Sequence, residues 1–134
     1  MQTDAEPGRS SVPHLLDAAR SGLTTMQELQ REYDNAMWDI EDPPHSKMRH
    51  IQIHLSSAVG RIADLIEPGD HRSHHGAAVD VRSLKADLAP VLADLLMHAA
   101  QLANLVDADL GEALAARYRA NASRFAPGSA LARP

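Results

Sequence analysis

Apolar residues recur at helical spacing in four segments of the chain, and no segment alternates in the manner of a half-buried strand. The four segments cover residues 24–38, 47–66, 83–105 and 110–124. Apolar positions three and four residues apart mark one face of an α-helix, whereas a strand repeats every second residue. The second segment shows the pattern most fully, at Ile51, Leu55, Ala58, Ile62 and Leu65. The sequence therefore predicts an all-α fold, a four-helix bundle.

Capping residues indicate where two of these helices begin. Thr25 is followed three positions later by Glu28, which is the spacing of a capping box. Asp109 and Glu112 repeat that spacing ahead of the last segment. We therefore expect the first helix to begin near Thr24 and the fourth to begin after Asp109.

Prolines indicate the breaks between helices. The stretch EDPPHS, residues 41–46, is predicted to separate the first and second helices. The stretch EPGDHRSHHG, residues 67–76, is predicted to be a loop after the second helix. A solvated, mobile loop is favoured, and the alternative is a metal or phosphate loop that uses His71, His74 and His75. Pro90 is expected to kink the third helix or to mark its true start. The predicted organisation is a flexible segment over 1–22, a helical domain over 23–127 and a flexible tail over 128–134.

The third segment is apolar on more than one face. Its large apolar residues are Leu92, Leu95, Leu96, Met97, Leu102 and Leu105. A helix of this kind must be buried on several sides, and one small chain has few layers with which to bury it. We therefore expect a homo-oligomer, either a dimer or a tetramer.

Composition narrows the possible partners. The chain has 134 residues, 44% hydrophobic and only 3% aromatic, so its core must be aliphatic. The absence of cysteine excludes disulfides and thiolate metal sites. A net charge of −5 argues against nucleic acid as the main partner. No run of 18 apolar residues and no charged-then-apolar leader occurs, so we expect a cytoplasmic protein without a membrane span.

Four stretches together resemble the MazG-like, all-α nucleoside triphosphate pyrophosphohydrolases. They are LTTMQELQREYDNAMWD, HIQIHLSSAVGRIADLI, LADLLMHAAQLANLVDADLGEAL and RYRANASRFAP, between Leu23 and Pro127. In that family the first helix ends near a Trp-Asp pair, matched here by Trp38 and Asp39. The second helix carries His-Leu-x-Glu-Glu-x-Gly-Glu-Leu, the third carries Glu-x-x-Asp, and the fourth ends in Asn-x-x-Arg-Tyr-Pro.

The resemblance implies hydrolysis of a nucleoside triphosphate to a monophosphate and pyrophosphate, with four carboxylates holding Mg²⁺. In this chain three of those four carboxylates are replaced, by Ala58, Arg61 and Val91. Ser57 replaces a further glutamate of the second-helix motif, next to Ala58. Asp94 remains, and Asp64 follows Arg61 by about one helical turn. One carboxylate and a guanidinium cannot hold Mg²⁺ in the family's way, so we expect no metal site and no cofactor.

Arg61 is the most informative of these substitutions. If the resemblance holds, its guanidinium occupies the place of the lost cation and takes the Asp94 carboxylate in a two-bond fork, or binds an anion. The alternative is that Arg61 faces solvent and pairs with Asp64 or Glu67 on its own helix.

Histidines supply the candidate chemistry. His50 and His54 are four residues apart on the second helix, and Asp94 and His98 are four apart on the third. If the two helices face each other, His54, Asp94 and His98 form a candidate acid–base site near neutral pH. A zinc site is the less favoured use of the same residues. The plain alternative is that His54 is a hydrogen-bonded core residue and His50 is solvated.

The remaining candidate ligand-binding residues come from the resemblance. Arg117, Asn121 and Arg124 match the family's phosphate-contacting tail, although cations are also favoured near the C-terminal end of any helix. Trp38 is a candidate stacking residue, although a lone Trp more often anchors packing.

Three functions stay open at this point. The first is a protein with a degenerate magnesium site that binds a nucleotide or another small ligand in a repurposed pocket, with metal-independent acid–base chemistry as a further possibility. The second is an atypical pyrophosphohydrolase that uses Asp94, Asp64 and acids from a neighbouring chain, with Mg²⁺ as its cofactor. The third is a structural dimerisation module. We favour the first because three of the four metal carboxylates are absent.

Overall fold

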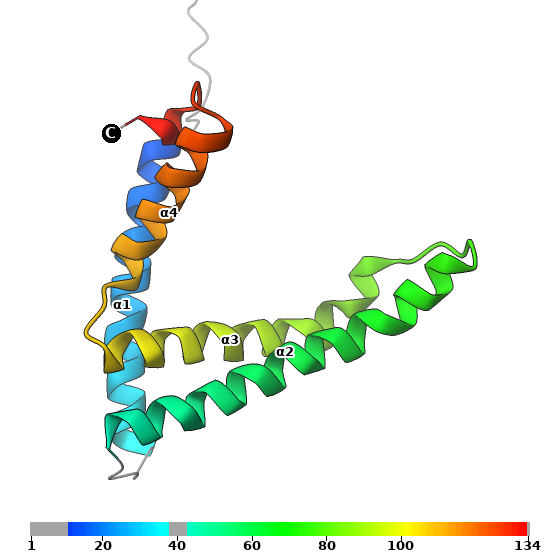
Figure 1. Ribbon diagram of the computed structural model, residues 1–134, viewed down its shortest axis with the longest axis horizontal. Helices are drawn as coiled ribbons and strands as arrows, with labels where there is room; N and C mark the ends of the chain where they lie inside the picture. Colours follow the sequence, from blue (N-terminus) through cyan, green and yellow to red (C-terminus); the bar gives the residue numbers. More distant parts are fainter. Residues whose placement is uncertain (1–10, 38–42, 134) are drawn as a thin grey trace, which may run out of the picture. The chain divides into compact units, whose positions relative to one another are not determined.

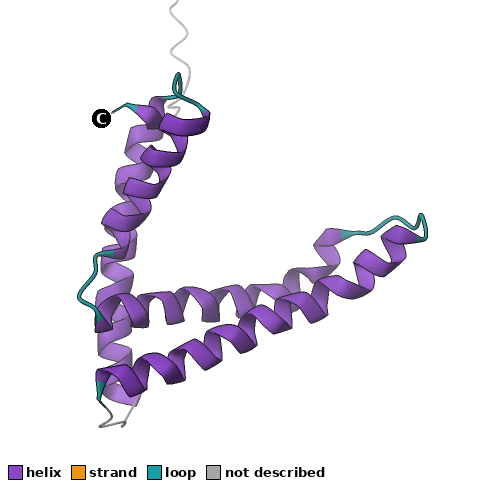
Figure 2. Ribbon diagram, viewed as in Figure 1, coloured by secondary structure: helices purple, strands orange, loops and turns teal. Residues whose placement is uncertain are grey.

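The structure is a computed structural model that describes residues 11–37 and 43–133. Its α-helices are α1 (Val12–Met37), α2 (Pro44–His74), α3 (Lys85–Leu105) and α4 (Leu110–Phe125), as Figure 1 shows. Two short 3₁₀-helices, η1 (Val81–Leu84) and η2 (Ala130–Ala132), complete the described elements. No strand occurs in these ranges (Figure 2), and the all-α prediction is confirmed.

The chain divides into two compact units. One unit contains residues 1–29 and 108–134, and the other contains residues 30–107. The first therefore holds the N-terminal part of α1 with α4 and η2, and the second holds the C-terminal part of α1 with α2, η1 and α3.

In the first unit, α1 and α4 lie side by side (Figure 1) and approach each other closely at Gly111. A Cβ atom at Gly111 would lie 2.3 Å from the backbone oxygen of Arg20, so only glycine fits this contact. The buried amide of Gln27 joins the same helices: it donates to the Ala108 carbonyl at 2.9 Å and accepts from the Leu110 backbone N–H at 2.7 Å. These bonds satisfy the Gln27 amide, whose burial without hydrogen-bond partners would destabilise the fold.

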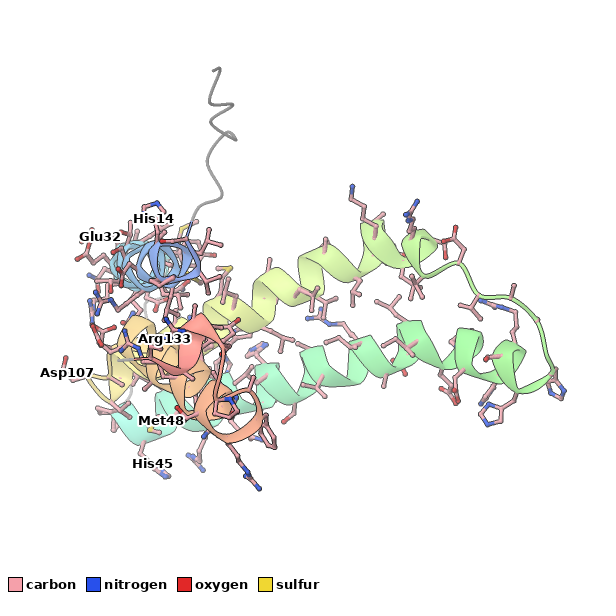
Figure 3. The ribbon with its side chains drawn as sticks, turned by 90° about the horizontal axis from the view of Figure 1, so that it is seen from above. His14, Glu32, His45, Met48, Asp107 and Arg133 are labelled. Carbon is pink, nitrogen blue, oxygen red and sulfur yellow. The ribbon has the colours of Figure 1, made fainter. Side chains whose placement is uncertain are left out.

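In the second unit, α2 and α3 run antiparallel beside each other, with side chains of both helices between the two ribbons (Figures 1 and 3). Ile51 and Ala58 are the buried residues of α2. The buried apolar residues of α3 are Val91, Ala100 and Ala103. The helix pair is thus held by a narrow aliphatic seam.

The described core is small. Ile51 is the one large side chain among the described residues that is fully buried, and the other fully or nearly fully buried apolar residues are mostly alanines. By contrast, Leu92 and Leu96 on α3 are 49% and 47% exposed, and Ile53 and Val59 on α2 are also exposed. Large exposed apolar patches on a soluble protein mark interaction surfaces.

The helical region Val81–Leu105, formed by η1 and α3, is long and apolar enough to cross a membrane by length and composition alone. Its most apolar 18-residue window has a mean hydropathy of 1.3, and 22% of that window is buried within the protein. The region still contains no run of 18 apolar residues, because Arg82, Lys85, Asp87 and Asp94 interrupt it. The core helix of a soluble protein and a signal sequence pass the same test.

The expected start of the first helix is wrong. α1 begins at Val12 rather than near Thr24, and the Thr25 hydroxyl donates to the Ser21 carbonyl at 3.1 Å inside the helix instead of capping it. Leu16 gives the reason, because it is a buried core residue in the part of α1 that precedes Thr24. Tertiary packing extends the helix past the local capping signal.

The expected loop over residues 67–76 is also wrong. α2 continues through Pro68 and ends at His74. The helix beyond Pro68 packs on the returning chain, since a Cβ at Gly69 would lie 3.1 Å from Cγ1 of Val79. A cavity of about 430 Å³ in this region is lined by Leu65, Gly69, Val79 and Leu84 among others. These apolar contacts offset the backbone hydrogen bond that proline removes.

One boundary prediction is confirmed by the structure. The Asp109 side chain accepts from the Glu112 backbone N–H at 2.9 Å and caps α4, which begins at Leu110. Pro90 lies inside α3, whose first residue is Lys85, so Pro90 does not mark the start of that helix. In the region before α3, the Asp80 side chain caps η1 by accepting from the Arg82 N–H at 3.0 Å.

Candidate functional site: a histidine pocket on the helix pair

A cavity of about 270 Å³ in the second unit contains the predicted polar patch. It is lined by His50 and His54 from α2, by Asp94, His98 and Gln101 from α3, and by Tyr33 from α1. We call it the histidine pocket. The four polar residues that the helical spacing predicted to meet do line one cavity.

The His54 imidazole contacts both of the other imidazoles of the pocket. Nε2 of His54 lies 3.1 Å from Nε2 of His50, with the ring centroids 4.6 Å apart. The His54 ring also stacks on the His98 ring, with centroids 5.7 Å apart and an interplanar angle of 28°. A hydrogen bond between the two Nε2 atoms needs one donor and one acceptor, so at least one of His50 and His54 is neutral when this bond forms.

A chain of hydrogen bonds fixes the proton of His98. Asp34 is a carboxylate and accepts at Oδ1 from the side-chain amides of Gln30 and Gln101, each at 2.9 Å. Because the Gln101 nitrogen donates to Asp34, its Oε1 faces His98 as an acceptor, 2.8 Å from Nδ1. His98 therefore carries its proton on Nδ1 and, when neutral, has a lone pair on Nε2. A ring oriented in this way can accept a proton at Nε2.

The predicted pairing of Arg61 with Asp94 is present. Nη2 of Arg61 lies 3.1 Å from Oδ2 of Asp94, across the helix pair. It is a single contact rather than the expected fork. The side chains are 51% and 45% exposed, so the pair is not buried. Glu67 instead lies 3.6 Å from His71, one turn further along α2.

Two positions where the resemblance places metal carboxylates are part of the core. Ala58 on α2 is fully buried and Val91 on α3 is nearly so. Within the described residues, no group of three or more His, Asp or Glu side chains is arranged to hold a metal ion. The donor set of this helix pair therefore does not fit the magnesium cluster that the resemblance implies.

The other candidate residues lie elsewhere or outside the described ranges. Arg117, Asn121 and Arg124 are exposed on α4, in the first unit, and the Arg124 guanidinium lies 4.9 Å from the Phe125 ring centroid. Trp38 lies outside the described residues.

The histidines of the predicted loop lie at the end of α2 instead. His74 is on the helix, with its Nδ1 3.0 Å from the Asp70 carbonyl, and His75 caps the helix end. His71, His74 and His75 are all exposed. Their position fits the solvated interpretation of this segment better than a ligand loop.

Sequence reasoning missed the residues that orient His98. Gln30 and Asp34 are one helical turn apart on α1, and His98 and Gln101 are one turn apart on α3. Each pair has the spacing at which helical side chains meet. That spacing signals two local pairs, but nothing local indicates that Asp34 and Gln101 meet across 67 residues of chain.

Comparisons with protein-family models, with curated proteins and with solved structures found no match to this chain. The resemblance to the MazG-like proteins therefore rests on the sequence motifs alone.

Proposed function

We propose that this protein binds a small ligand, with a nucleotide as the first candidate, in the histidine pocket and without a magnesium cluster. The single observation that carries the proposal is the Arg61–Asp94 contact of 3.1 Å beside three imidazoles. It puts a cation next to the one carboxylate that is retained from the implied metal motif. The proposal treats the chain as a MazG-like frame with a changed site.

The orientation of His98 supports acid–base chemistry as a further part of this proposal. Because Nδ1 of His98 is hydrogen-bonded to Oε1 of Gln101, the neutral His98 ring has its lone pair at Nε2. Ligand pockets usually combine an apolar wall with a few placed polar groups, and Tyr33 and Met97 supply such a wall here.

We also propose that the working form is a cytoplasmic homo-oligomer. The support comes from the exposed apolar residues of α2 and α3, among them Ile53, Leu92 and Leu96. A second copy of the chain would bury such surface, at about 25 cal/mol for each Å² removed from water. A structural dimerisation module is the second candidate, and it needs this surface but not the histidine pocket.

The test is calorimetric titration of a panel of nucleoside mono-, di- and triphosphates in EDTA, on the wild-type chain and on His98→Phe. We expect at least one nucleotide to bind the wild type and to bind His98→Phe at least about tenfold more weakly, a loss of about 1.4 kcal/mol. His45→Phe is the matched control, because His45 lies at the N-terminal end of α2 (Figure 3) and does not line the pocket.

A second assay measures pyrophosphate release from the same nucleotides with Mg²⁺ or Mn²⁺. We expect none at rates typical of enzymes, about 1 per second or more. Release at such rates would support the atypical pyrophosphohydrolase instead. If no nucleotide binds and the wild type still assembles, the dimerisation module becomes the better account.

A further inference from the structure

The unit formed by residues 30–107 has a second cavity, whose wall contains an arginine and a lysine instead of the histidines of the histidine pocket. Its volume is about 380 Å³, and its charged lining residues are Arg31 and Asp34 from α1 and Lys47 from α2. Asn35 adds an amide to the wall. We call it the cationic cavity. It shares Ile51 and Gln101 with the histidine pocket but none of the histidines.

The two cations of this cavity, Arg31 and Lys47, form no ion pair within the part of the chain that the structure describes. Asp34, in contrast, is already held by two amide donors, from Gln30 and Gln101. Two cations and one carboxylate leave one net positive charge in the wall, within a chain of net charge −5. The cationic cavity is thus a local exception to the acidic character of the chain.

Two cations that line one cavity and have no ion-pair partner among the described residues suit an oxyanion. A guanidinium presents donors in a planar fork that matches the edge of a phosphate group, and an ammonium binds phosphate as a point charge. Arg31 and Lys47 provide one of each, from two different helices. The volume of the cavity falls at the lower end of the range for small-molecule sites, about 300–1,000 Å³.

We infer that the cationic cavity binds the phosphate group of a small molecule through Arg31 and Lys47. Asn35 supplies a neutral donor beside them, and the carboxylate of Asp34, held by its two amides, limits the excess of positive charge. This site stands apart from the proposed function, because it uses no histidine and would exist whether or not a nucleotide enters the histidine pocket.

The test is calorimetric titration of the full chain with inorganic phosphate at constant ionic strength. The variant is Arg31→Gln with Lys47→Gln, which removes both cations. The matched control is Arg49→Gln with Lys85→Gln, which removes one Arg and one Lys from residues that line neither cavity. Far-ultraviolet circular dichroism confirms that both double variants keep their helices.

We expect saturable phosphate binding by the wild type, and a Kd at least about tenfold weaker in the Arg31→Gln, Lys47→Gln variant, which corresponds to about 1.4 kcal/mol. The control variant should stay within about twofold of the wild type, because a change in net charge alone acts only through screened long-range interactions.

Three results would overturn the inference. One is the absence of saturable phosphate binding by the wild type. Another is an equal loss in both double variants, which would indicate unspecific attraction to charge. The third is succinate binding as tightly as phosphate with the same dependence on Arg31 and Lys47, which would assign the site to carboxylates instead.

Discussion

Replacing Arg61 and Asp94 singly and together measures what their contact contributes to folding. The cycle uses Arg61→Gln, Asp94→Asn and the double variant, which remove the charges and keep most of the side-chain volume. The free energy of unfolding of each variant is then compared with that of the wild type. The coupling term of the cycle isolates the interaction between the two side chains.

The structure predicts a small coupling. The guanidinium and carboxylate meet through one contact at 3.1 Å, and the side chains are 51% and 45% exposed. Exposed ion pairs typically contribute about 0.2–1 kcal/mol, because water screens the charges and two long side chains lose freedom. A buried pair would cost about 3–5 kcal/mol on removal of one partner. We therefore expect a coupling below about 1 kcal/mol.

Urea denaturation followed by circular dichroism gives the four free energies. The protein concentration is held fixed, because the proposed assembly would contribute to the apparent stability. Repeating the cycle at about 1 M salt, where the screening length falls to about 3 Å, should reduce the coupling further. A coupling of about 3 kcal/mol or more at low salt would refute the reasoning, since it would require a desolvated pair.

Three further predictions concern packing. Ile51→Ala should lower the free energy of unfolding by about 2–5 kcal/mol in urea denaturation, because Ile51 is the one large fully buried side chain described; a loss under about 1 kcal/mol would contradict this. Gly111→Ala should destabilise the chain by about 1–3 kcal/mol, since a Cβ there would lie 2.3 Å from the Arg20 carbonyl oxygen, and an unchanged melting temperature would contradict it. Leu96→Glu should lower the mass measured by light scattering at micromolar concentration, because a charge would enter the proposed interface; a wild type that is already monomeric would rule this out.

The parts of the fold that local signals determine were predictable from the sequence. Asp109 caps α4 as expected, because a cap needs only its own side chain and the backbone N–H three residues on. The helical periodicity of the second segment likewise places Ile51 and Ala58 in the core. Both features depend on residues within one or two turns of each other.

The parts that depend on distant residues were not predictable. α2 passes through Pro68 because its last turns contact Val79, and α1 starts before Thr24 because Leu16 is part of the core. A local sequence pattern shows that proline removes a helical hydrogen bond. It does not show the packing with distant residues that compensates for this loss.

The candidate site also has some features that local sequence predicted and others that depend on distant residues. The spacing of His50, His54, Asp94 and His98 predicted two polar faces, and the cavity confirms that they meet. The bond from Gln101 to Asp34 was not predicted, because it joins side chains that are far apart in the sequence. The exposure of the Arg61–Asp94 pair could not be read from the sequence either, since it depends on how closely α2 and α3 approach at that point.

The central claim is that Arg61 stands beside Asp94 where the resemblance places a divalent cation. Electron paramagnetic resonance of Mn²⁺ titrated with the wild-type chain tests it most directly, because bound and free Mn²⁺ give different signals. The account predicts no saturable Mn²⁺ binding tighter than about 1 mM, a free energy of about −4 kcal/mol. Stoichiometric Mn²⁺ binding tighter than this and abolished by Asp94→Asn would contradict the claim.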